Sequence, residues 1–74
     1  MGISNRDIEA LARARRDHAK SKVLQLRRAL VDARFRGDRE SVNEIEYQIL
    51  EYAQVADAPF GMIVQSVRDE YMGR

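Results

Sequence analysis

The chain has 74 residues, of which 45% are hydrophobic and 34% are charged, and its formal net charge is +1. A chain of this length forms one domain at most and buries only about 60% of its unfolded surface, so a partner or a second copy would add to its stability. It contains no cysteine and one histidine, which excludes disulfides and thiolate metal sites. We therefore expect a single domain over residues 1–74.

Neither a secretion signal nor a membrane span is recognisable in the sequence. The N-terminal residues lack the apolar stretch of a signal peptide. No window approaches the roughly 18 uninterrupted apolar residues that a transmembrane helix needs. These observations predict a cytoplasmic protein that does not enter a membrane.

The charges are distributed unevenly along the chain. Residues 1–39 hold 11 of the 13 Lys and Arg residues against five acids, a balance of +6. Residues 40–74 hold two basic residues against seven acids, a balance of −5. Such asymmetry indicates either charge pairing within the fold or a basic surface that meets an acidic partner.

Residues 5–36 have the composition of one long helix. Ser4 and Asp7 resemble a capping box, and neither Gly nor Pro interrupts the chain before Gly37. Gly37 provides the left-handed conformation that closes a helix. The apolar stripe of this helix fills a sector of about 120° and is richest in Leu and Val toward the C-terminal end.

Two shorter helices are expected after Gly37, over residues 39–56 and 60–72. Asp38 is the expected N-cap of the first, although Ser41 and Glu44 form a competing capping box that would start this helix a turn later. Pro59 ends this helix and suits the first turn of the next. Helix 39–56 carries an apolar seam at steps of three and four residues, formed by Val42, Ile45, Ile49, Tyr52 and Ala56. The sequence thus predicts an all-α fold in which this helix and the long one form an antiparallel αα-hairpin. The third helix packs either on the start of the first helix or on another chain.

Basic residues on helix 5–36 form the most specific surface pattern. Five of them recur at seven-residue steps and one lies beside them: Arg6, Arg13, Lys20, Arg27, Arg34 and Arg16. Seven residues are nearly two helical turns, so these side chains, here called the basic row, stay on one side of the helix. The row is either an ordinary solvated face, a contact for an acidic protein surface, or a contact for nucleic-acid phosphates.

A second candidate surface consists of apolar residues on the two shorter helices. Helix 39–56 is apolar on more than one face, which indicates more than one neighbour. The predicted oligomer or partner interface comprises Tyr47, Leu50, Val55, Phe60, Met62, Ile63, Val67 and Tyr71. These side chains are covered either within one chain or by a partner.

Residues suited to catalysis are few. The serines have no base placed near them by sequence, and there is no phosphate-binding Gly-rich loop and no zinc-protease motif. We expect a protein that is not an enzyme, with no catalytic residue, no cofactor, no metal and no small-molecule substrate.

The function that the sequence favours is a small helical protein-interaction module with coiled-coil-like packing. It would be homo-oligomeric, or a subunit or regulator of a larger assembly. A bacteriophage or mobile-element accessory protein is one such possibility, because short helical chains are frequent in that class. The alternative is a nucleic-acid-associated protein that binds through the basic row.

Overall fold

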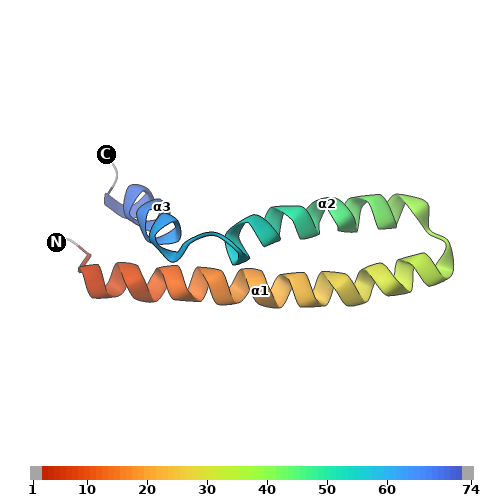
Figure 1. Cartoon of the computed structure of the whole chain (residues 1–74), viewed down its shortest axis with the longest axis horizontal. Helices are drawn as coiled ribbons and strands as arrows, with labels where there is room; N and C mark the ends of the chain where they lie inside the picture. Colours follow the sequence, from red (N-terminus) through yellow and green to blue (C-terminus); the bar gives the residue numbers. More distant parts are fainter. Residues whose placement is uncertain (1–2, 73–74) are drawn as a thin grey trace.

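Three helices make up residues 3–72, the part of the chain that the computed structural model describes: α1 (Asn5–Arg36), α2 (Arg39–Ala56) and α3 (Phe60–Met72). Residues 1, 2, 73 and 74, the ends of the predicted domain, lie outside the described residues. α2 folds back along the C-terminal half of α1, and α3 lies over the N-terminal half (Figure 1). The predicted all-α hairpin with a short third helix is confirmed, and it forms a rod of 52 × 21 × 20 Å.

Both ends of α1 are capped by the residues that the sequence indicated. The hydroxyl of Ser4 accepts a hydrogen bond of 3.2 Å from the backbone N–H of Asp7. At the other end Gly37 has φ 70°, and the N–H groups of Gly37 and Asp38 donate to the carbonyls of Arg34 and Ala33. This left-handed cap satisfies the last carbonyls of the helix and turns the chain back toward α2.

The residues directly before α2 and α3, Asp38 and Pro59, start these helices for different reasons. The two carboxylate oxygens of Asp38 accept hydrogen bonds from the backbone N–H of Ser41 at 3.2 Å and from its hydroxyl at 2.7 Å. The carbonyl of Pro59 accepts from the N–H of Met62 at 3.0 Å, which begins the first turn of α3. Pro59 lacks an N–H and therefore fits where a helix starts and not where one continues.

The seam between α1 and α2 is narrow and only partly covered. On α1 it buries Ala19, Val23 and Ala33, whose small size lets the two backbones come close. No described residue of α2 is fully buried, and the predicted seam residues of α2 remain half-buried. Two paired helices cover each other on one side only, so this seam stays accessible from both flanks of the hairpin.

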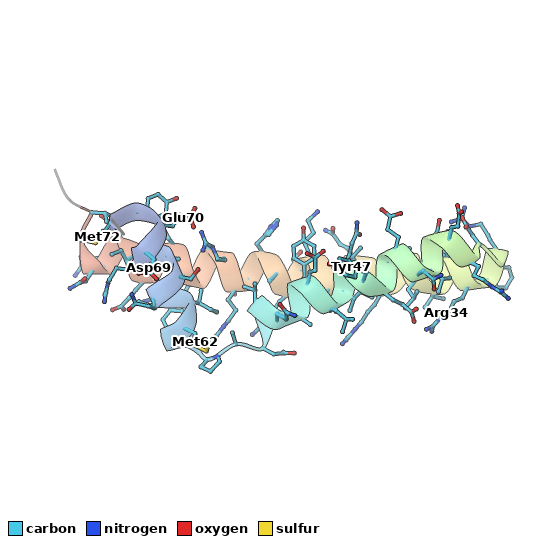
Figure 2. All side chains as sticks on the ribbon, turned by 90° about the horizontal axis from the view of Figure 1, so that it is seen from above. Arg34, Tyr47, Met62, Asp69, Glu70 and Met72 are labelled. Carbon is cyan, nitrogen blue, oxygen red and sulfur yellow. The ribbon has the colours of Figure 1, made fainter. Side chains whose placement is uncertain are left out.

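The core of the molecule lies where α3 crosses α1. Ile8 and Ala12 from α1 meet Ile63 and Val67 from α3, and all four are buried. α3 turns out of the line of α2 and runs across α1 (Figures 1 and 2). The third helix therefore packs on its own chain. None of the described helices combines the length and the apolar character needed to cross a membrane.

Candidate functional site

Two members of the basic row, Arg13 and Arg34, form ion pairs within the chain. Arg13 lies 3.6 Å from the carboxylate of Glu9 on the same exposed face. Arg34, which is labelled in Figure 2, pairs across the hairpin with Glu46 of α2 at 3.1 Å. The complementary charges of the two halves of the chain are thus partly matched inside one molecule, although exposed pairs of this kind contribute little to stability.

Arg16 belongs to the basic row by sequence but is used inside the fold. Its Nη2 donates a hydrogen bond of 3.0 Å to the carbonyl of Ala58, and its guanidinium carbon lies 5.1 Å from the ring centre of Phe60. Both contacts are made to the connection between α2 and α3. This arginine is therefore a structural residue and is not available to an external partner.

Three members of the row remain exposed without an ion pair among residues 3–72: Arg6, Lys20 and Arg27. Lys20 and Arg27 are about 10.5 Å apart along the helix, and Arg6 lies about 21 Å before Lys20. The unpaired positive surface is consequently much sparser than the seven-residue pattern suggested.

The predicted interface residues divide into two groups. Four are exposed: Tyr47, Leu50, Met62 and Tyr71. Figure 2 looks down on α2 and α3 and shows Tyr47 on α2 and Met62 near the start of α3. The other four belong to the chain's own interior, because Ile63 and Val67 are buried and Val55 and Phe60 pack against them. The exposed group offers the larger surface to a partner, and Ile63 and Val67 offer none.

Three exposed apolar residues of α1 were not predicted as part of a site. Leu24, Val31 and Phe35 are 59%, 67% and 91% exposed. Their spacing of seven and four residues places them on one side of α1, outside the stripe that packs against α2. This spacing is visible in the sequence, but it stands outside the stripe that forms the core. The sequence therefore predicted no site there.

Two adjoining grooves run along one flank of the hairpin. The larger has a volume of about 450 Å³ and is lined by Arg27, Leu30, Glu46, Ile49 and Leu50. The second, of about 280 Å³, shares Arg27 and is lined also by Lys20, Val23, Leu24, Ala56 and Asp57. Val31 follows Leu24 by seven residues and Arg27 by four, so it lies on the same side of α1. We call Leu24, Leu30, Val31, Ile49 and Leu50 the apolar flank.

The opposite flank is more polar. Its groove, of about 510 Å³, is lined by Lys22, Leu26, Gln48, Glu51, Tyr52 and Val55. Here the rings of His18 and Tyr52 meet in a T-shaped arrangement, with centroids 6.2 Å apart, which closes part of the seam. The exposed leucines of the hairpin are therefore concentrated on one of its two sides.

A hollow of about 320 Å³ lies where the three helices meet, bordered by Arg15, Ala58, Met62 and Ser66. Arg15 donates to the carboxylate of Glu70 at 2.6 Å and faces the Ser66 hydroxyl at 3.5 Å. Because the guanidinium is already neutralised, the hollow offers no charge for an anionic ligand. Among the described residues no group of three His, Cys, Asp or Glu side chains is placed to hold a metal ion.

Comparison of the chain with protein-family models, with curated proteins and with solved structures gives no match. The class is therefore defined by the structure itself: a small, extended helical protein with many exposed hydrophobic side chains.

Proposed function

We propose that this chain is a non-enzymatic protein-interaction module that binds a partner through the exposed apolar side chains of its hairpin. The observation that carries the proposal is the concentration of Leu24, Val31 and Leu50 on one flank, each more than half exposed. Contiguous exposed apolar surface on a small protein typically marks a site of association.

The packing of α2 supports the same conclusion. Ile49 and Leu30 are only half-buried, and both line the groove on the apolar flank. A partner laid into this groove would remove their remaining apolar surface from water, worth about 25 cal/mol for each Å² covered. Association would thus complete a core that two helices cannot complete alone.

Site-specific photocrosslinking tests the proposal. A photoreactive residue is placed at Leu24 or Leu50 of the chain in its native cells, and at the exposed polar positions Gln25 and Glu51 of the same two helices as controls. We expect discrete protein adducts from the two leucine positions and none from the controls. The absence of adducts at both leucine positions would refute the function, and the adduct mass reports whether the partner is another copy or a different protein.

A nucleic-acid-associated function is the second candidate, because Arg6, Lys20 and Arg27 are exposed and unpaired within the described part of the chain. Binding of this kind would weaken steeply with salt, since each phosphate contact releases counterions. Fluorescence polarisation with labelled DNA and RNA, for the wild type and for Lys20→Glu, decides this case. Binding that is insensitive to both salt and the substitution would exclude the basic row as a phosphate contact.

A further inference from the structure

The apolar flank is bordered by two cations of α1 that are unpaired within the described part of the chain, Lys20 and Arg27, and by an anion of α2 with a free oxygen. Arg27 borders it on α1 and has no ion pair within residues 3–72. Glu46 borders it on α2 and uses Oε2 for Arg34, while its Oε1 has no hydrogen-bond partner in the same range. A carboxylate can accept from two guanidinium groups at once. The flank is therefore self-complementary in charge as well as apolar at its centre.

We propose that the partner of this flank is a second copy of the chain, placed so that α1 of each copy packs against α2 of the other. The inference rests on the proposed interaction function and names its partner and arrangement. Arg27 of each copy then pairs with the partner's Glu46, and the leucines of both flanks form the centre of a four-helix bundle. A two-fold interface requires such reciprocity, because each contact between two different residues occurs twice.

The charges of the helices select one of the two possible two-fold axes. An axis along the hairpin places the basic α1 opposite the partner's acidic α2 and keeps all neighbouring helices antiparallel. An axis across the hairpin through Arg27 places α1 against the partner's α1, so that Arg27 would face its own copy and Lys20 would face the partner's Arg34. Like charges brought together across an interface oppose association, so the longitudinal axis is favoured.

The available area sets the expected strength of the dimer. α2 has 18 residues and is about 27 Å long, and the rod is 20 to 21 Å wide. A flank of this size buries about 550 Å² on each copy, close to the lower end of specific interfaces. The dimer should therefore depend on concentration over the range from about 1 μM to about 1 mM.

Charge exchange between two variants tests the pairing. Arg27→Glu and Glu46→Arg are purified separately, and sedimentation is measured for each alone and for their equimolar mixture. In a dimer of either variant alone, position 27 of each copy would face a like charge at position 46 of the other copy. Each variant alone should therefore dimerise at least about tenfold more weakly than the wild type. The mixture restores both reciprocal pairs and should form a heterodimer with affinity close to that of the wild type. Loss of folding cannot imitate this rescue, because the same chains are present in both measurements.

A matched pair on the opposite flank serves as the control. Lys22 and Glu51 face each other across the polar groove with the same relation of α1 to α2. Lys22→Glu and Glu51→Lys should leave dimerisation unchanged, alone or mixed.

Two outcomes would contradict the proposal in different ways. If the wild type dimerises but the mixture of Arg27→Glu and Glu46→Arg does not, the proposed contact is wrong and the interaction function is unaffected. A wild type that stays monomeric to about 1 mM would overturn the second copy as partner, and the crosslinking adducts described above would then identify a different protein.

A single spin label distinguishes the two axes. The chain has no cysteine, so Ala10→Cys on the exposed part of α1 gives one label for each copy. With the longitudinal axis the two labels lie side by side, within about 30 Å of each other at ordinary helix spacings. With the transverse axis through Arg27 they would be about 50 Å apart, since 17 residues separate the two positions. A distance near 50 Å would overturn the arrangement.

Discussion

The guanidinium of Arg16 in α1 donates a hydrogen bond of 3.0 Å to the carbonyl of Ala58, 42 residues later in the chain. The carbonyl belongs to the short connection that follows α2, and the same guanidinium lies over the ring of Phe60, the first residue of α3. The Nε of Arg16 is buried without a hydrogen-bond partner in the described part of the chain. One side chain of the long helix thus fixes the point from which α3 crosses it.

Replacement of Arg16 by Ala should lower the free energy of unfolding by about 1–2 kcal/mol, because a hydrogen bond from a charged donor and a cation–π contact are lost together. Urea unfolding followed by circular dichroism measures this difference. Arg13→Ala is the control, since Arg13 is exposed and touches only Glu9 at 3.6 Å. The control should change stability by less than about 0.5 kcal/mol. Equal effects of the two substitutions would show that the Ala58 contact does not anchor α3.

The two glycines at helix ends should respond to alanine with opposite signs. Gly37 has φ 70°, which strains any side chain although no atom lies within 4 Å of the added Cβ. Gly37→Ala should therefore cost about 1 kcal/mol of stability. Gly61 lies in α3 with open space around it, and Gly61→Ala should stabilise the protein by up to about 0.5 kcal/mol. Thermal unfolding of the two variants compares them, and a shift in the same direction for both would contradict the assignment of Gly37 as the helix-ending residue.

Helix boundaries were predictable because the signals that set them are local. Ser4, Gly37 and Pro59 act on backbone groups within four residues, so the expected ranges 5–36, 39–56 and 60–72 agree with the structure. The hairpin followed from the same signals, since a helix stop directly followed by an N-cap leaves room for little more than a tight reversal.

Which side chains are free to form a site depends on tertiary contacts, so it could not be predicted from local signals as the helix boundaries were. Arg13 and Arg16 look alike in the sequence, yet only Arg16 meets the start of α3. The direction in which α3 leaves Pro59 decides this, and no local signal encodes that direction. Leu24 shows the converse case, because it lies outside the core stripe and its place beside a groove depends on where the end of α2 lies.

Asp38 should make the stability of the hairpin depend on pH in the acid range. The hydrogen bonds that its carboxylate accepts from the side chain and then the backbone of Ser41 lower its pKa below the usual value of 3.8, and nearby Arg36 contributes in the same direction. A group whose pKa is lower in the folded state stabilises the fold above its unfolded pKa and loses this contribution as the pH falls through the folded pKa. The advantage of the wild type over Asp38→Ala should therefore be complete at neutral pH and decline below about pH 4.

Urea unfolding of these two proteins at a series of pH values measures that advantage. Asp38→Asn is a useful third protein, because an asparagine still caps the helix but carries no charge to titrate. The difference between Asp38→Asn and Asp38→Ala should stay constant over the same pH range. If the wild-type advantage were also constant down to pH values well below 4, the ionised carboxylate would have no special part in the cap.

The last prediction concerns the small core on which α3 depends. Ile8 is fully buried against Val67, and this cluster is the main apolar contact between α3 and α1. Ile8→Ala removes three carbon atoms from a site that has little freedom to collapse, so it should cost about 2–4 kcal/mol. Met62, on the same helix α3 but 65% exposed, gives the matched control, and Met62→Ala should cost less than about 0.5 kcal/mol.

Ile8→Ala should also release α3 selectively, because Ile8 belongs to the core between α1 and α3. A domain of this size has only a few kcal/mol of stability in total, so this loss is a large part of it. Hydrogen exchange should then show faster exchange of α3 amides than of those in the α1–α2 hairpin. Uniform loss of protection in all three helices would mean instead that α3 and the hairpin unfold as one unit.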